Sequence, residues 1–168
     1  MFADEARFGR MNRIRPCWAP LGTRPAVAAQ LIRQYICLYG AVSPKDGTCV
    51  YLIMPTSNTA SFQAFLQVLA HRFARQDILL VLDGAPNHRC GALAVPRNIR
   101  LLYLPPYSPE LNPKENIWDE IREKIFKNFA LKSMDAVRAK LKQAILYLAR
   151  NPTLVRSITS FPYIVSSL

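Results

Sequence analysis

The chain has 168 residues, of which 51% are hydrophobic and two are tryptophan, and its formal net charge is +11. This length and composition argue against a disordered chain and predict a single globular domain with a full core. No apolar stretch is long enough to span a membrane and the first residues are not a signal peptide, so we expect a cytoplasmic protein. The four cysteines lie far apart and form no Cys-x-x-Cys pair, which argues against zinc.

Positive charge is concentrated in two segments. Six arginines and no acid lie between Arg7 and Arg33, and six basic residues and one acid lie between Lys124 and Lys142. Clustered positive charge is typical of proteins that bind a polyanion, most often nucleic acid. A basic surface that only keeps the protein soluble would give the same composition, so charge alone leaves both interpretations open.

The first half of the chain predicts a strand, a loop, a hairpin and a helix. Phe2–Asp4 has the pattern of the end of a strand that delivers an acid, and residues 7–25 have no period and predict a long irregular loop. Strands over residues 34–42 and 48–54, joined by a turn with Pro and Gly, predict an antiparallel hairpin. Apolar residues at helical spacing then predict an amphipathic helix over residues 61–75.

The middle of the chain predicts two parallel strands. Ile78–Leu82 is an unbroken apolar run, typical of a strand that is covered on both faces, and it is followed by Asp83. Residues 89–95 leave room for a short helix only, and residues 99–104 predict a second strand. The connection is too long for a tight hairpin, so a short crossover to a parallel strand fits better.

The last third predicts two helices. One begins with Asn112 as N-cap and Pro113 in the first helical position. The other begins at Ser133 and stops before Asn151, and the rest of the chain has no informative pattern.

Three acids hold positions suited to chemistry, and each also has an ordinary structural explanation. Asp83 follows a strand at the edge where α/β sheets bind ligands, but Asp-Gly is also a common turn. Glu115 lies three residues after Asn112, which fits a capping box without any chemistry. Asp4 alone would be an ordinary acidic N-terminus.

Three blocks of the sequence together resemble the catalytic motifs of one family. The blocks are Phe2-Ala3-Asp4-Glu5-Ala6-Arg7-Phe8-Gly9, Val81-Leu82-Asp83-Gly84-Ala85-Pro86-Asn87-His88, and Leu104-Pro105-Pro106-Tyr107-Ser108-Pro109-Glu110-Leu111-Asn112-Pro113-Lys114-Glu115-Asn116-Ile117-Trp118. They resemble the blocks of bacterial insertion-sequence transposases of the mariner-related superfamily of DDE enzymes, and the third is the most specific. The segments Trp18–Gly22 and Gly40–Val42 are also similar, and the resemblance extends to about Asn151.

The resemblance implies an α/β, ribonuclease H-like fold and a metal site. It implies a mixed five-stranded sheet, with three antiparallel strands and then two strands parallel to the first, flanked by helices. It implies that Asp4, Asp83 and Glu115 are the catalytic acids. From the needs of phosphodiester cleavage we expect them to hold two Mg²⁺ or Mn²⁺ ions, with Asp4 bridging both. Three carboxylates without a Cys or His cage suit such hard cations. Asn87 and His88 are candidates to orient a ligand or phosphate, and a purely structural role for His88 stays open.

The resemblance also implies a division of the chain. Residues 1–151 would form the DDE catalytic domain, with its first strand cut short, and residues 152–168 a C-terminal tail. The N-terminal helix-turn-helix region by which such transposases bind their transposon ends is expected to be absent. The second reading frame of a frameshifted element, a decayed remnant and a subcloned fragment would each look like this sequence.

The function implied by the resemblance is that of a DNA transposase catalytic domain. It would hydrolyse phosphodiester bonds at transposon ends and transfer the freed 3′-hydroxyl into target DNA. Its partners would be double-stranded DNA and a second copy of the chain, at the bacterial nucleoid and away from membranes. The basic residues expected at DNA are Arg7, Arg10, Arg13, Arg15, Arg24, Lys124 and Lys127. Two alternatives stay open: a stand-alone nuclease of the same fold, and a non-catalytic DNA-binding or regulatory fragment.

Overall fold

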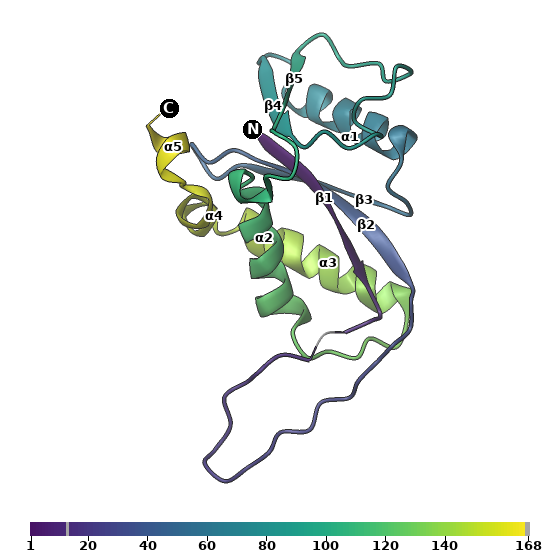
Figure 1. Cartoon of the computed structure of the whole chain (residues 1–168), viewed down its shortest axis with the longest axis vertical. Helices are drawn as coiled ribbons and strands as arrows, with labels where there is room; N and C mark the ends of the chain where they lie inside the picture. Colours follow the sequence, from purple (N-terminus) through teal and green to yellow (C-terminus); the bar gives the residue numbers. More distant parts are fainter. Residues whose placement is uncertain (13, 167–168) are drawn as a thin grey trace.

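The computed structural model, which describes residues 1–12 and 14–166, contains one five-stranded mixed sheet in the order β3-β2-β1-β4-β5 (Figure 1). The strands are β1 (Phe2–Gly9), β2 (Tyr35–Val42), β3 (Cys49–Met54), β4 (Ile78–Leu82) and β5 (Ile99–Tyr103). β2 pairs antiparallel with β1 and β3, whereas β4 pairs parallel with β1 and β5. The predicted order of three antiparallel strands followed by two parallel ones is confirmed.

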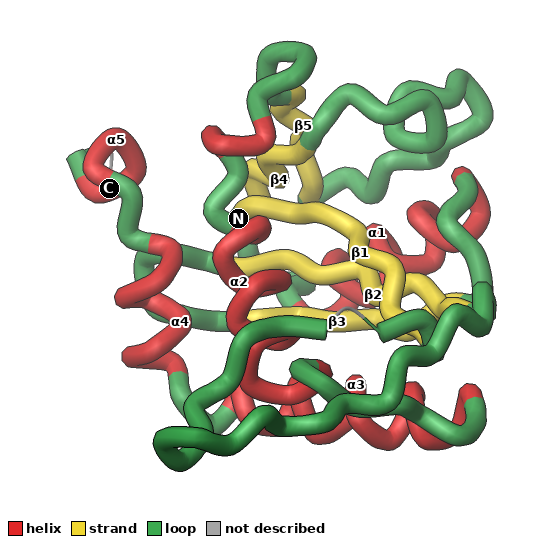
Figure 2. The backbone as a smooth tube through the Cα atoms, turned by 60° about the horizontal axis from the view of Figure 1, so that its bottom comes forward, coloured by secondary structure: helices red, strands yellow, loops and turns green. Residues whose placement is uncertain are grey.

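Helices cover both faces of this sheet. They are α1 (Thr59–Arg72), α2 (Lys114–Ile121), α3 (Met134–Ala149), α4 (Pro152–Thr159) and α5 (Pro162–Val165). α1 packs on one face, and α2 and α3 pack on the other (Figures 1 and 2). Two hydrophobic cores result, one between α1 and the sheet and one between the sheet and the helices α2, α3 and α4. No helix within the described residues is long and apolar enough to cross a membrane.

The two longest helices begin where side chains satisfy their free N–H groups. Asn58 Oδ1 accepts a hydrogen bond from the backbone N–H of Ser61 (2.8 Å), and Ser133 Oγ accepts one from that of Ala136 (3.1 Å). Such caps replace hydrogen bonds that the first turn of a helix cannot make internally. The start of α3 at Ser133 therefore agrees with the sequence, whereas α1 begins two residues before the predicted Ser61 and ends at Arg72.

The first strand differs from its prediction. β1 continues to Gly9, so Asp4 lies near its start and not at its end, and residues 7–9 belong to the strand and not to the loop. The start of β1 is tied to β4, because the amino group of Met1 donates to the carbonyl oxygen of Leu79 (2.7 Å) and the N–H of Val81 donates to that of Met1 (2.8 Å). Asp4 therefore lies on a strand that is hydrogen-bonded near its beginning.

Two further segments differ from their predictions. Residues 89–95 form turns without a helix, although β5 is parallel to β4 as expected. The segment after Asn151, expected to be a tail, forms α4 and α5, and α4 buries Val155 and Thr159 completely. Packing against the other helices therefore stabilises the segment after Asn151, whose own sequence pattern did not predict helices.

A long two-armed loop, described over residues 10–12 and 14–34, lies between β1 and β2 and projects from the body (Figure 1). Its arms are joined at the base, where the N–H of Arg10 donates to the carbonyl oxygen of Gln34 (2.9 Å) and that of Asn12 to Gln30 (3.2 Å). Trp18 and Leu21, farther along the loop, are fully exposed. The loop is therefore fixed at its base and free of the core at its tip.

The packing of α4 against the body can be tested at Gly47. Gly47 has a φ of +75°, and a Cβ at this position would overlap the carbonyl oxygen of Pro152 at the start of α4. Gly22 has a similar φ of +79° but no atom within 4 Å of such a Cβ. Left-handed backbone costs an Ala residue about 1–2 kcal/mol, so Gly22→Ala should lose about that free energy of unfolding.

Gly47→Ala should lose clearly more, because α4 must also move. Urea denaturation of the two variants measures the difference. An equal loss in both would mean that the turn between β2 and β3 does not pack on α4 in solution.

Candidate active site

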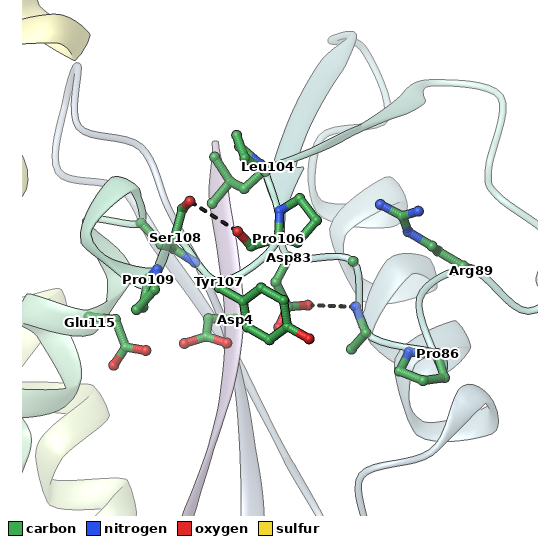
Figure 3. Close-up of a pocket in the computed structure, with 14 residues that line it drawn as sticks. Asp4, Asp83, Pro86, Arg89, Leu104, Pro106, Tyr107, Ser108, Pro109 and Glu115 are labelled. Atoms are coloured by element: carbon green, nitrogen blue, oxygen red, sulfur yellow. Dashed lines mark hydrogen bonds between the residues drawn. The ribbon is translucent and has the colours of Figure 1, made fainter.

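A cavity of about 490 Å³ lies where β1 and β4 bring the two halves of the sheet together, and all three predicted acids line it. Asp4 comes from β1, Asp83 follows β4, and Glu115 lies in the first turn of α2. Figure 3 shows Asp4 between Glu115 and Asp83, with Tyr107 of the proline-rich segment in front of them. The cavity lies at the carboxyl ends of β4 and β5, where α/β sheets bind ligands.

The chemistry of this cavity is that of oxygen donors. Its lining includes three carboxylates and neither Cys nor His, a set that suits Mg²⁺ or Mn²⁺ better than zinc. Across residues 1–12 and 14–166, no three His, Cys, Asp or Glu side chains lie close enough together to hold one ion among them. The three acids therefore line one cavity and are of a type that suits hard cations, but they do not form a closed three-ligand cage.

Asp4 is half-buried against α2. Its Oδ2 accepts a hydrogen bond from Nε1 of Trp118 (2.7 Å). Burial raises the pKa of Asp4 to about 7; the Trp118 bond opposes this rise, and the charges of Glu115 and Glu5 add to it. A carboxylate with this pKa gains from a nearby cation, because a positive charge stabilises its ionised form.

Asp83 is held by His88. The imidazole Nδ1 lies 2.7 Å from Asp83 Oδ1, and Nε2 lies 3.0 Å from Glu5 Oε2. Burial alone would lower the pKa of His88, but its hydrogen bonds to Asp83 and Glu5 and the charges of these carboxylates raise it to about 9. The protonated ring therefore donates to both acids at neutral pH, and the bond from His88 holds the pKa of Asp83 below its usual value.

Glu5 is a part of the site that the sequence analysis did not single out. Its Oε1 accepts hydrogen bonds from Ser57 (2.9 Å) and Asn87 (3.2 Å), so Asn87 supports Glu5 and not Asp83 directly. Burial would raise the pKa of Glu5, but its hydrogen bonds, that of His88 first, lower it below the usual value. Because side chains alternate along a strand, Glu5 faces away from Asp4. The only signal for Glu5 in the sequence was that an acid within a strand needs a polar partner.

Lys114 is the second part that the sequence analysis missed. Its side chain is fully buried, and Nζ donates to the hydroxyl of Tyr51 (3.0 Å). Nζ also lies 4.1 Å from the ring centroid of Tyr51 and 4.3 Å from the Trp118 ring, which is cation–π geometry. Burial lowers the pKa of Lys114 to about 7. A lysine is rarely buried, so no pattern predicts this position.

The hydrogen bonds at the start of α2 argue against a capping role for Glu115. The Asn112 side chain accepts a hydrogen bond from the N–H of Lys114 (3.1 Å) and donates to the carbonyl oxygen of Ala3 (3.1 Å). The N–H of Asn112, which a capping box would give to the Glu115 side chain, donates instead to the carbonyl oxygen of Pro109 (2.9 Å). Glu115 is therefore not a capping residue, and its side chain lines the cavity.

The two basic segments meet at the base of the long loop. Arg10 Nε donates to the carbonyl oxygen of Leu131 (3.0 Å), and Arg15 pairs with Glu123 (2.9 Å), which also pairs with Lys127 (3.3 Å). The guanidinium of Arg7 stacks on Tyr35, 5.0 Å from its ring centroid.

Three other residues, Arg13, Arg24 and Lys124, were also predicted to contact DNA. Arg24 and Lys124 are exposed, and Arg13 lies outside the described residues. The contacts at the base of the loop thus join parts of both basic segments into one surface beside α2.

One cation lies at the cavity itself. Arg89, which the sequence analysis did not single out, lines the cavity beside Asp83, and its guanidinium stacks 4.6 Å from the ring centroid of Tyr103. Stacking of this kind holds a guanidinium in one orientation and leaves its N–H groups available.

Several solved structures share this fold. A pre-cleavage Mos1 transpososome matches with a TM-score of 0.65 and 17% identity over 94% of this chain and 53% of that chain. A Mos1 mariner paired-end complex with Mn matches with a TM-score of 0.66 and 17% identity over 94% and 52%. The catalytic domain of Mos1 mariner transposase matches with a TM-score of 0.55 and 16% identity over 80% and 75%. The chain spans about half the length of the Mos1 chains in the two complexes, and the predicted ribonuclease H-like fold is confirmed.

Sequence comparison agrees with the fold. The chain is 37% identical over 101 residues to the uncharacterized protein y4pE/y4sA of Sinorhizobium fredii (strain NBRC 101917 / NGR234), over 60% of this chain and 75% of that protein. Residues 1–138 match the family described as DDE superfamily endonuclease. This match includes all three acids of the cavity and most of the chain, so the protein belongs to the DDE endonuclease superfamily.

Proposed function

We propose that this chain is the catalytic domain of a DNA transposase, in which Asp4, Asp83 and Glu115 are the catalytic acids. The observation that carries the proposal is that these three carboxylates, distant in sequence, line one cavity in a protein of the DDE superfamily. The reaction would be hydrolysis of a phosphodiester bond at the transposon end, followed by joining of the freed 3′-hydroxyl to target DNA. Residues 1–151 would be the catalytic unit, with α4 packed against it.

The acids would hold two Mg²⁺ or Mn²⁺ ions, with Asp4 shared and Asp83 and Glu115 each on one side of it. The place of Asp4 between the other two supports this assignment (Figure 3). Such ions would supply an activated oxygen nucleophile and stabilise the leaving oxyanion. Mos1 paired-end complexes determined with Mn and with Mg support a divalent cation here.

The protein groups around the acids would keep them oriented. Trp118 binds Oδ2 of Asp4, and His88 and the N–H of Ala85 both bind Oδ1 of Asp83, so one oxygen of each of these two acids is held in place. We propose that His88, itself held by Glu5, orients Asp83, and that Asn87 acts through Glu5. Outer partners of this kind strongly affect the affinity of a metal site.

The DNA would run from the cavity onto the basic surface beside α2. The predicted residues Arg7, Arg10, Arg15, Arg24, Lys124 and Lys127 would contact phosphates, and Arg89 would contact the phosphate nearest the acids. The partner would be double-stranded DNA and the active form a homodimer. A Mos1 paired-end complex with the left transposon end supports the DNA partner.

Catalysis is tested by Asp83→Asn, which keeps the size of the side chain and removes the charge. The variant should lose Mg²⁺-dependent nicking of a duplex that carries the transposon end, by at least about 100-fold, because a lost ligand leaves an ion unanchored. DNA binding, measured by fluorescence anisotropy, should change little. Asp77→Asn is the matched control, since Asp77 is exposed and precedes the same strand at its other end. Wild-type nicking by Asp83→Asn would show that Asp83 is structural.

A pre-cleaved transposon end separates the proposal from its alternatives. A transposase joins the 3′-hydroxyl of this substrate to a target plasmid, a stand-alone nuclease only cuts, and a DNA-binding fragment does neither. Joined product that appears with Mg²⁺ and disappears in Asp83→Asn would support the transposase.

The charged His88 bridge predicts a pH dependence of stability. Its folded-state pKa of about 9 is above the usual value, so its stabilising effect is complete below about pH 6.5 and is lost as the pH rises through 9. Without metal, the difference in unfolding free energy between wild type and His88→Gln should be largest near pH 6, on the order of 3 kcal/mol, and should shrink toward pH 10. Urea denaturation at four pH values measures it, and a constant difference would contradict an imidazolium bridge.

The basic surface predicts a salt-dependent affinity for DNA. Each phosphate contact on duplex DNA contributes about −0.9 to the slope of log affinity against log salt. Arg24→Ala and Lys124→Ala should each weaken binding and reduce the slope by roughly one contact. Arg75→Ala, an exposed arginine just after α1 on the other face of the sheet, is the control. Equal slopes in all variants would place the DNA elsewhere.

A further inference from the structure

The space above one glycine of β2 is occupied by a side chain from α2. Gly40 is paired with Asp4 on one side and with Tyr51 on the other. A Cβ at Gly40 would lie 2.6 Å from both Cε and Nζ of Lys114 and 2.8 Å from Cε1 of Tyr51. Real Cβ atoms do not come so close to other atoms, so the end of Lys114 fills the volume that any other residue at position 40 would need.

Lys114 is held at both of its ends in this volume. Nζ is bound to the Tyr51 hydroxyl between the Tyr51 and Trp118 rings, and the backbone N–H is bound to the side chain of Asn112. Ordering a buried lysine costs side-chain entropy, and burying its charge costs more. Replacement of a buried charge by an apolar residue is often neutral or stabilising. A gain in protein stability therefore does not explain why residue 114 is a lysine, whereas the fixed position of its side chain does.

The position that is fixed is that of the first turn of α2. Glu115 follows Lys114 directly, and Trp118, one turn later, donates to Asp4. We propose that Lys114 is a positioning residue: laid across Gly40 and bound to Tyr51, it fixes α2 on the sheet and so sets the position of Glu115 relative to Asp4. This inference rests on the proposed function insofar as Asp4 and Glu115 hold metal together.

The first test is Lys114→Met, which keeps an unbranched apolar side chain, one atom shorter than lysine, and removes the donor to Tyr51. The affinity for Mn²⁺, measured from free Mn²⁺ by electron paramagnetic resonance, should fall by roughly tenfold. The melting temperature should stay the same or rise, because an apolar side chain replaces a buried charge. Lys45→Met, an exposed lysine in the turn after β2, should bind Mn²⁺ like the wild type, and Asp4→Asn should lose tight binding.

Two results would overturn the proposal. If Lys114→Met binds Mn²⁺ like the wild type while Asp4→Asn does not, Lys114 does not position the site. If Lys114→Met fails to fold, the lysine is needed for the fold as a whole and a positioning role is rejected.

The second test perturbs the same contact from the strand. Gly40→Ala should weaken Mn²⁺ binding by a similar factor, because the new Cβ displaces Lys114. In a Lys114→Ala background the space is free and the Tyr51 ring can move into it, so Gly40→Ala should then have little further effect on Mn²⁺ affinity. Equal effects of Gly40→Ala in both backgrounds would show that Gly40 does not serve Lys114. If Lys114→Ala does not fold, the Lys114→Met result decides.

Failure of this inference is distinguishable from failure of the proposed function. A wild-type protein that binds Mn²⁺ through Asp4 and loses affinity in Lys114→Met, but does not nick DNA, would support the positioning role and reject the nuclease and transposase functions. The opposite result is a protein that nicks DNA while its Lys114→Met variant keeps full Mn²⁺ affinity. It would reject the positioning role and support the nuclease or transposase function.

Discussion

The structure depends on the narrow join between β1 and β4. The two strands share one paired position, Phe2 with Val81, and the hydrogen bonds of Met1 complete it. This join unites the antiparallel half of the sheet with the parallel half and brings Asp4 and Asp83 to one edge. β4 ends at Leu82, whereas β1 continues to Gly9. Beyond Asp4, β1 therefore pairs with β2 on one side and with no described strand on the side of β4. The cavity and the His88 segment occupy the region where a longer β4 would have run.

Neighbouring carboxylates on β1 have opposite electrostatic environments because a strand sends successive side chains to opposite faces. Asp4 meets Trp118 on the α2 face, near two other acids, and its pKa is raised. Glu5 meets His88, Ser57 and Asn87 on the α1 face, and its pKa is lowered. One acid is thereby suited to take up a cation, while the other is already neutralised by a protonated histidine. The strand thus supplies both an acid for a ligand and a support for Asp83.

The sequence predicted the sheet, the long helices and the three acids of the cavity, because apolar runs, capping residues and specific motifs are local signals. It did not predict Lys114 or Glu5, since a buried polar group is explained by partners far away in the chain, here Tyr51 and His88. The extent of β1 and the helices after Asn151 were missed for a related reason: pairing with β2 and packing on the core stabilise segments whose own pattern is weak. Glu115 had two explanations in the sequence, and the hydrogen bond from the N–H of Asn112 to Pro109 argues against the capping one.

The contact between Gly40 and Lys114 also couples the substitutions that these two distant positions can accept. The end of the lysine and a Cβ at position 40 cannot occupy the same volume, so a larger residue there requires the end of Lys114 and the Tyr51 ring to move. A shorter residue at position 114 would remove part of this requirement. A substitution within the third motif therefore changes which substitutions the second strand accepts, and the two positions are expected to diverge as a pair.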